Sequence, residues 1–346
     1  MKMPGALRGD KVDPGPTPMN AENAEPFITR RGQPVGLRSR MILWAMRWVL
    51  RPMLLRLIEG SRKKIARTQL RTLAQRCSDS AGLNIAYRMI GRAPGHLIGT
   101  FEPSEDPFVL WLHGGAFILP AAPSVHFTAI ALLCRDLGAS AFLPDYRLAP
   151  ANPFPAGLDD CDRAYRALLA GGISPHRIVL GGDSAGGNLA LGLLQRIRKA
   201  GLPNPACAVM LSPVTDLSRV GGLPSRTGVM KSDPILPAEA LYRMDELYSG
   251  GADSSDPELS PLFADCTGFP PLYLIASDNE VLLDDSVMFA RRAHADGVSV
   301  RCDIWPKFPH AFLLFEKLFP EVGPARADIV EFAETSLAAA QGGFQP

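Results

Sequence analysis

A serine surrounded by glycines lies in the stretch VLGGDSAGGNLALGL, in the middle of the chain. Residues 177–180 predict a short buried strand, and residues 188–197 predict a helix. Joining the two through one or two residues makes a strained turn, and side chains two positions from its centre would collide with it. Gly182 and Gly186 occupy those positions around Ser184. The spacing indicates a serine nucleophile; the other interpretation is an ordinary turn with a helix-capping serine.

A serine hydroxyl is a poor nucleophile unless a base removes its proton. Where this turn carries a nucleophile, the acid and then the histidine follow it in the chain, which leaves His294 and His310 as bases. His294 lies in RRAHADG, the polar end of a predicted helix, where a solvated surface position is expected. His310 lies in WPKFPHAFLLF, directly after the last predicted strand and at the sheet edge from which Ser184 emerges. We therefore expect His310 to be the base.

The acid that orients such a histidine must follow the preceding strand, which is predicted to end near residue 276. The sequence there offers Asp278 and Glu280 in a turn, and Asp284 and Asp285 in a predicted helix. The spacing alone leaves Asp278 and Glu280 as alternatives. The one that does not contact the histidine is then expected to be a turn or helix-capping residue.

The oxyanion of a tetrahedral intermediate needs N–H donors. One is expected from Ala185, the residue after the nucleophile. A second source is the stretch FVLWLHGGAF, in which Gly114 and Gly115 follow a predicted strand and can turn their amides toward the serine. Without the serine turn, the two glycines would indicate only a strand-ending turn.

Composition limits the remaining choices. The chain has 346 residues, 47% of them apolar, with a net charge of +1, which suits one large α/β domain with a smaller appendage. We expect no nucleic-acid partner, because no recognition motif accompanies the basic residues. The six cysteines are scattered and no His/Cys cluster has metal-ligand spacing, so we expect reduced thiols, a cytoplasmic location and no metal or other cofactor.

Strands and helices alternate from about residue 84, which predicts a mostly parallel sheet with helices on both faces. Strands are expected at 84–90, 96–100, 108–112, 139–143, 177–180, 206–211, 272–276 and 298–305. Further helices are expected at 124–137, 158–169, 282–295, 311–318 and 325–339. A long insertion at about 215–257 includes a predicted helix at 238–247 and is a candidate lid.

The N-terminal part divides into two segments. Residues 1–26 lack periodicity and are expected to be disordered, without the apolar core of a signal peptide. Residues 27–76 hold thirteen Lys and Arg but one acid, and within them residues 41–58 are strongly apolar. Arg47, Arg51 and Pro52 argue against a transmembrane span there. Either this segment lies at a membrane interface with Trp44 and Trp48 as anchors, or it packs as a cap over the body.

Six motifs in this order resemble the hormone-sensitive lipase family of α/β-hydrolase esterases, the bacterial type IV group. They are HGGAF (113–117), DYRLAP (145–150), NPFPA (152–156), GDSAGGNLA (182–190), SPLFAD (260–265) and FPHAF (308–312). The resemblance covers about residues 84–340. It implies the α/β-hydrolase fold, a mostly parallel central sheet with helices on both faces and a helical cap.

The resemblance also carries site residues onto this chain. The serine, the histidine and the oxyanion glycines of the family match Ser184, His310, Gly114 and Gly115. The family acid, usually an aspartate, matches Glu280 in EVLLD, thirty residues before His310, with Asp278 in reserve. Ala116 stands where a third glycine is frequent, so the pocket floor is expected to be slightly narrower. DYRLAP is expected to hold the HGG turn, and Asp183 to order the serine turn.

The implied cap comes from residues 27–76 and the insertion at 215–257, with residues 77–340 as the catalytic domain. Met230, Leu241 and Tyr242 are then candidate pocket residues. The implied activity is cofactor-free hydrolysis of small carboxylic esters with short to medium acyl chains, through an acyl-enzyme. The alternatives are a non-catalytic small-molecule receptor on the same fold, and an amidase or peptidase. Membrane contact through residues 41–58 and a homodimer are the further partner expectations.

Overall fold

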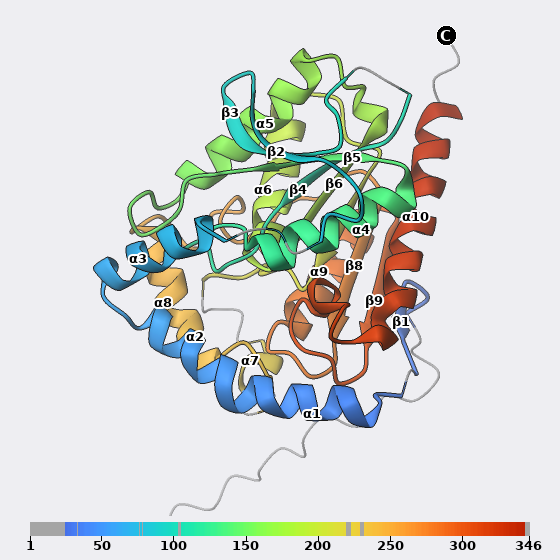
Figure 1. Cartoon of the computed structure of the whole chain (residues 1–346). Coiled ribbons are helices and arrows are strands. Elements are labelled where there is room, and N and C mark those ends of the chain that lie inside the picture. The colour runs from blue at the N-terminus through green and yellow to red at the C-terminus, as the bar shows by residue number, and fades with distance from the viewer. Residues whose placement is uncertain are drawn as a thin grey trace, which may run out of the picture.

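A nine-stranded sheet runs through the part of the chain that the computed structural model describes, residues 25–342 without 33, 76, 78, 103–104, 219–222 and 229–231 (Figure 1). The strand order is β1-β9-β8-β7-β6-β4-β5-β3-β2; β2 and β3 run antiparallel to their neighbours and all other pairs are parallel. The strands are β1 (Ile28–Arg30), β2 (Ile85–Ile90), β3 (Ala93–Ile98), β4 (Phe108–Leu112), β5 (Ser140–Pro144), β6 (Ile178–Asp183), β7 (Cys207–Leu211), β8 (Leu272–Ser277) and β9 (Val300–Trp305).

Helices cover both faces of this sheet, as the alternating pattern predicts. The N-terminal helices are α1 (Leu37–Ala45), α2 (Arg51–Ile58) and α3 (Arg62–Leu73), with a π-helical turn, η2 (Met46–Leu50), between α1 and α2. The helices that follow the strands are α4 (Thr128–Leu137), α5 (Ala156–Ala170), α6 (Ala185–Lys199), α9 (Leu283–Ala295) and α10 (Gly323–Gly342). The insertion supplies α7 (Ser225–Gly228) and α8 (Ala238–Ser249).

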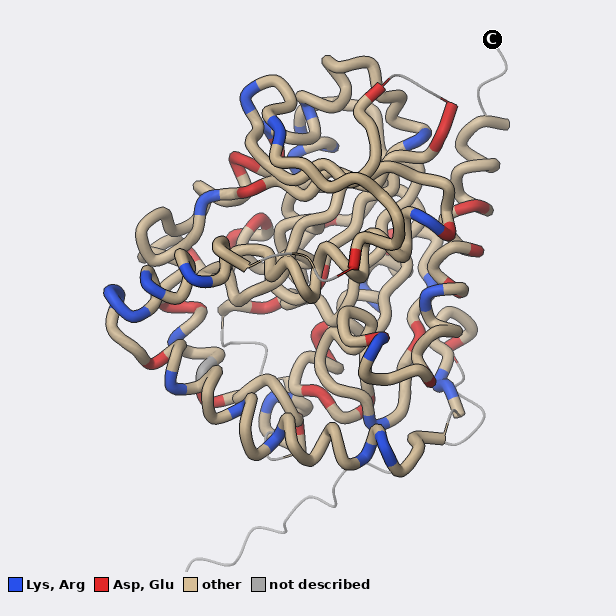
Figure 2. Tube along the Cα trace, viewed as in Figure 1, with Lys and Arg blue, Asp and Glu red and all other residues tan. Residues whose placement is uncertain are grey.

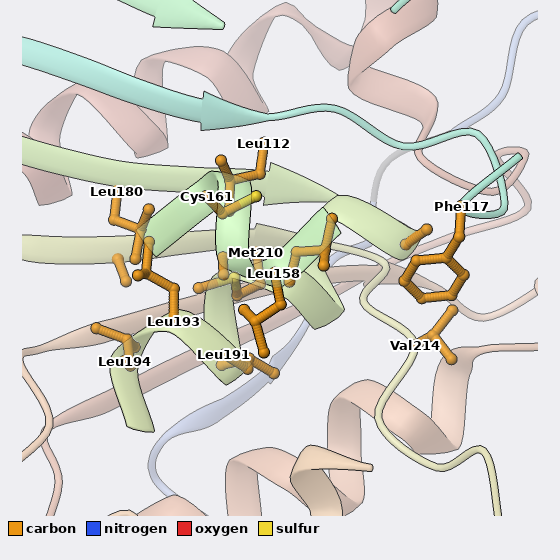
Figure 3. Packing of buried hydrophobic residues seen from close by; sticks show 14 of the residues in the cluster. Leu112, Phe117, Leu158, Cys161, Leu180, Leu191, Leu193, Leu194, Met210 and Val214 are labelled. Carbon is orange, nitrogen blue, oxygen red and sulfur yellow. The ribbon is translucent and has the colours of Figure 1, made fainter. Parts of the chain in front are cut away.

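Alternation along the strands divides the core into two layers. On β4, Leu110 and Leu112 pack with residues of α5 and α6, whereas Val109 and Trp111 pack with residues of α4 and α10. Successive strand side chains point to opposite faces, so a strand buried on both faces must be apolar throughout. Figure 3 shows the first layer, with sheet residues against leucines of α6. Every residue of β4, β6, β7 and β8 is buried, which explains their unbroken apolar sequences.

The topology brings the ends of distant strands together. The strand β5, which follows β4 in the chain, pairs with one edge of β4. The next strand, β6, pairs with the opposite edge of β4. Such a switch point, at the carboxyl ends of parallel strands, is where ligands bind in open α/β sheets. The HGG turn follows β4, the serine turn follows β6, the acid turn follows β8 and the histidine loop follows β9. All four segments therefore meet at one edge.

The N-terminal segment joins the fold in two ways. Residues 28–30 form β1, which pairs in parallel with β9, although no strand is predicted there from the sequence. Further on, Ile58 and Ile65 are buried in the same apolar cluster as Phe117. The α2 helix lies against α8 of the insertion, where Arg51 forms an ion pair with Glu239 (2.9 Å). These contacts connect the N-terminal helices with the insertion and with the core.

Two helix expectations need refinement. The structure has a 3₁₀ turn at Phe312–Phe315 in place of a continuous helix at 311–318, and a second 3₁₀ turn follows at Pro320–Val322. Residues 41–58 form helical structure interrupted by η2, which ends two residues before Pro52. Proline has no N–H to donate to the helix, and a π-turn is one way in which a helix accommodates such an interruption. Among the described residues, no helix combines the length and apolarity needed to cross a bilayer.

Candidate active site

Ser184 occupies the sharp turn between β6 and α6. Its φ of 54° and ψ of −119° are unfavourable for a residue with a side chain, and such strain concentrates at functional sites. A Cβ added at Gly186 would overlap the carbonyl oxygen of Leu112, and one at Gly182 would overlap that of Gly186. The reason inferred for both glycines is therefore confirmed. The Ser184 side chain makes no capping hydrogen bond to α6, which argues against the interpretation as a simple helix cap.

The structure brings His310 and Glu280 together. Nδ1 of His310 lies 3.1 Å from Oε2 of Glu280, and both side chains are buried. The second oxygen, Oε1, accepts a hydrogen bond from the Ser277 N–H (3.1 Å), which fixes the carboxylate. Nε2 of His310 is buried and has no hydrogen-bond partner within the described residues. The imidazole thus has one nitrogen held by an acid and one available for chemistry.

Asp278, the alternative acid, faces elsewhere. It is exposed, and its Oδ1 accepts a hydrogen bond from the Lys307 N–H (2.6 Å). Asp278 thus ties the histidine loop to the end of β8, as expected for the acid that does not contact the histidine. His294, the alternative base, is exposed and stacks on Phe27, as a surface position implies.

Hydrogen bonds hold the histidine loop over the sheet edge. Ser277 Oγ donates to the Phe308 carbonyl (2.7 Å), and the Ala311 N–H donates to Ser212 Oγ (3.1 Å). Ser212 follows Leu211, whose carbonyl accepts the Ser184 N–H (2.8 Å). The loops carrying the serine and the histidine therefore meet at the end of β7. Positive φ angles at Ser212 and Ala311 add to the strain gathered around this site.

Electrostatics favour a basic His310. Burial lowers its pKa, but the hydrogen bond and the charge of Glu280, with further contributions from Asp233 and Asp183, outweigh burial. The net effect is a pKa above the usual 6.5. A raised pKa suits a general base, because the imidazole then takes up a proton more readily.

Asp233 is a buried carboxylate that the sequence did not single out. It lies in the insertion, and its Oδ1 accepts the N–H groups of Ile235 and Leu236, at 2.8 Å each. Its Oδ2 accepts the N–H of Val281 (3.0 Å), the residue after Glu280. Burial is the main cause of its pKa, raised to about 6, although His310 acts in the opposite direction. Asp233 therefore links the insertion directly to the acid turn.

The HGG turn needs one correction. The Gly114 N–H donates to Oδ2 of Asp183 (3.0 Å), so it is directed at that carboxylate and is not available for an oxyanion. The role expected of Gly114 is therefore not supported, because the buried carboxylate of Asp183 needs this hydrogen-bond donor. Gly115, at φ 123°, and Ala185, at the start of α6, remain the expected oxyanion donors. Ala116 adopts φ 58°. Glycine, the residue that is frequent at this position in the resembled family, would adopt this conformation without strain.

Asp183 joins the serine turn to the HGG turn. Besides Gly114, it accepts Trp111 Nε1–H (3.0 Å), and His126 Nε2 lies 3.4 Å away. Burial raises the pKa of Asp183, but the nearby His126 and these hydrogen bonds outweigh it and hold the pKa below its usual range. The ordering role expected of Asp183 is thus observed. The sequence contained no signal for the contributions of Trp111 and His126.

Tyr146 of DYRLAP fixes the residue before the two glycines. Its hydroxyl donates to the His113 carbonyl (2.6 Å), and its ring stacks on the His113 imidazole with centroids 4.2 Å apart. Burial lowers the pKa of His113 to about 3, so the imidazole is neutral near pH 7. The structural role expected of DYRLAP is confirmed.

The three candidate pocket residues have different outcomes. Leu241 is buried in the same apolar cluster as Ala185. Tyr242 is 56% exposed and shares the exposed face of α8 with Glu239 and Glu246. Met230 lies outside the described residues. On the inner face of α8, the Tyr248 ring stacks on Phe117 of HGGAF at 3.6 Å between centroids, a contact that the sequence did not predict.

Comparison with known proteins identifies the family of this chain. A sequence family with the description "alpha/beta hydrolase fold" matches residues 109–314, which are more than half of the chain. The chain therefore belongs to this family.

Its relatives narrow the class. An acetyl-hydrolase of Streptomyces hygroscopicus is 38% identical over 213 residues, which are 62% of this chain and 70% of that protein. An esterase of Acinetobacter venetianus is 35% identical over 242 residues, 68% of this chain and 77% of that protein. The crystal structure of an esterase from the bacterial hormone-sensitive lipase family has 31% identity and a TM-score of 0.75, and the match covers 87% of this chain and 99% of that one. Two of these three proteins are esterases and the third is an acetyl-hydrolase. The resemblance read from the motifs is confirmed.

Proposed function

We propose that this protein is a carboxylic ester hydrolase that works through an acyl-enzyme on Ser184. The observation that carries the proposal is the buried contact between His310 Nδ1 and Glu280 Oε2, on a loop tied to the same strand end as the strained Ser184. An imidazole oriented by a carboxylate, with its second nitrogen unpartnered, is what a serine nucleophile requires. The esterases among its relatives support the same activity.

The first half of the reaction forms the acyl-enzyme. Ser184 Oγ attacks the ester carbonyl carbon while His310 Nε2 takes the hydroxyl proton. The N–H groups of Gly115 and Ala185 stabilise the oxyanion, since preformed donors need no reorganisation as charge develops. When the ester C–O bond breaks, His310 returns the proton to the leaving alcohol. Glu280 stabilises the imidazolium that forms in between.

The second half releases the acid. Water attacks the acyl carbon while His310 again accepts a proton, the oxyanion occupies the same donors, and Ser184 leaves as a hydroxyl. No step needs an oxidant, a reductant or a metal ion in this scheme. Every proton that His310 accepts is returned within the cycle.

The proposed substrates are esters with short to medium acyl chains. The test is a panel of p-nitrophenyl esters from acetyl to palmitoyl, assayed with the full chain. We expect kcat/KM to be highest among the shorter acyl groups and to fall steeply toward palmitoyl. A maximum at palmitoyl would contradict the proposed chain-length preference while leaving ester hydrolysis in place. Absence of hydrolysis across the panel by folded protein would contradict the proposed activity.

The pH profile should report the His310 environment. Only neutral His310 can accept the Ser184 proton, so kcat/KM should fall as pH decreases through the pKa of that imidazole. Because the pKa is raised, the midpoint of this acid limb is expected above pH 6.5. In Glu280→Gln, the contact that raises the pKa is removed, so the residual activity should have its midpoint at lower pH. Rates between about pH 5 and pH 9, followed at the isosbestic wavelength of nitrophenol, measure both midpoints.

A further inference from the structure

Exposed apolar side chains are concentrated on α1, η2 and the start of α2. Among the described residues, fifteen large apolar side chains are exposed, and seven of them fall within residues 37–53. Trp44 and Trp48 are 66% and 62% exposed, and Leu37 and Met41 are 75% and 63% exposed. Exposing this much apolar surface in one place costs free energy, and such patches usually mark an interaction site.

These side chains form one outward face. Leu37, Met41, Trp44 and Trp48 are separated by four, three and four residues, the spacing that places side chains on the same side of a helix. The opposite side faces the body, where Ser39 is buried and its Oγ donates to Glu321 at 2.8 Å. The helix is therefore anchored by its inner side. Packing as a cap accounts for that side but leaves the outer face without an occupant in the described structure.

Basic residues flank the face. Arg38, Arg40 and Arg47 are exposed beside it, and residues 37–58 contain no Asp or Glu. Figure 2 shows that basic positions recur from α1 to α3 along the same edge of the molecule. A second copy of this face would bring arginines against arginines, which disfavours self-association. Residues 1–24 hold three bases and three acids, so they offer no net negative charge to match it.

We propose that the outward face of α1 and η2, which we call the Trp44 face (Leu37, Met41, Trp44 and Trp48 with Arg38, Arg40 and Arg47), docks onto the surface of a membrane that contains anionic lipid. Tryptophan is favoured at the boundary between acyl chains and headgroups, and arginine is attracted by anionic headgroups. The α1 helix lies on the same side of the molecule as α7 and α8 (Figure 1). Docking would therefore turn the cap toward the lipid. The proposal does not depend on ester hydrolysis.

Vesicle co-sedimentation of the full chain tests this docking. We expect binding to vesicles of phosphatidylcholine with phosphatidylglycerol, and binding at least about tenfold weaker to phosphatidylcholine alone or at about 0.5 M salt. Tryptophan emission gives a second readout, because Trp44 and Trp48 are exposed whereas Trp111 and Trp305 are each 1% exposed. Emission should therefore shift to shorter wavelength when anionic vesicles are added.

Paired variants give the control. Trp44→Ser with Trp48→Ser, and separately Arg40→Gln with Arg47→Gln, should each weaken binding about tenfold or more. Met89→Ser, and Arg88→Gln with Arg92→Gln, make matching changes at exposed positions of the β2–β3 hairpin and should leave binding unchanged. Circular dichroism melts check that each variant is folded.

Three results would overturn the docking proposal. One is wild-type protein that does not bind anionic vesicles. Another is equal weakening by the variants of the Trp44 face and by their hairpin controls. The third is a dimer seen by sedimentation velocity that Trp44→Ser with Trp48→Ser dissociates, without vesicle binding by the wild type; the Trp44 face would then be a self-association surface. Ester hydrolysis is assayed separately, so loss of docking and loss of activity remain distinguishable.

Discussion

Replacing Ser184 with alanine is expected to reduce ester turnover by at least about 10³-fold. The change removes the oxygen that forms the acyl bond, and no other group at the site can replace it. Its effect on stability should be small, because the Ser184 side chain makes no capping hydrogen bond to α6 and alanine fits the same space. A helix-capping serine would give the opposite result, a loss of stability of about 1 kcal/mol with turnover retained.

A fluorophosphonate probe makes this test independent of substrate choice. The probe phosphonylates an activated serine with release of fluoride, so intact-mass measurement should find one adduct on the wild type and none on Ser184→Ala. Ser174→Ala, at an exposed serine outside the site, should be labelled and active like the wild type. Retained turnover in Ser184→Ala would place the nucleophile elsewhere. Wild-type protein that is folded, unlabelled and inactive would favour a small-molecule receptor, and faster cleavage of amides than of esters would favour an amidase.

The second large effect is expected at Glu280. Glu280→Gln should lower kcat by about 10²- to 10⁴-fold, because a neutral amide cannot stabilise the imidazolium and can hold the ring in the wrong tautomer. Asp278→Asn should change kcat less than about threefold, since the asparagine Oδ1 can still accept the Lys307 N–H. Both variants exchange one carboxylate for its amide within the same turn, so they differ mainly in which group contacts the histidine.

The ranking of these two variants decides the assignment of the acid. Steady-state kinetics on one short-chain ester, with thermal melts as a check on folding, are sufficient. If Asp278→Asn is the more damaging change, the contact between His310 and Glu280 does not represent the catalytic arrangement. If both changes are harmless, the histidine works without a carboxylate partner and the proposed triad is wrong.

Much of the fold could be predicted because local rules and the global fold agree. The parallel strands are apolar throughout since they are buried on both faces, and this makes them visible in the sequence. Gly182 and Gly186 could be explained before any coordinates, because a turn that tight leaves no room for a Cβ. The motif order then placed Ser184 and His310 at one sheet edge, where the structure has them.

Other features depend on contacts that spacing does not encode. The strand β1 is three residues long, too short for a periodic signal, and forms because β9 offers it an open edge. Asp278 and Glu280 are both carboxylates of one turn, and only the path of the histidine loop separates them. Gly114 looked free to bind an oxyanion because nothing in its own motif reveals that Asp183 takes its N–H. Tyr242 faces outward because the helical phase of α8 is set by Tyr248 and its other buried residues.

The strand β1 also affects how this enzyme can be shortened or fused. Beyond its pairing with β9, Arg31 forms an ion pair with the buried Asp303 of that strand (2.5 Å), and Ile58 and Ile65 fill the core further along. In a chain that started after residue 76, β9 would be an edge strand with unpaired backbone N–H and C=O groups. The core would also have cavities where Ile58 and Ile65 pack. Such a fragment is expected to aggregate by edge-to-edge pairing. The N-terminal segment thus covers the open edge of the sheet at β9, and a minimal catalytic unit has to retain it.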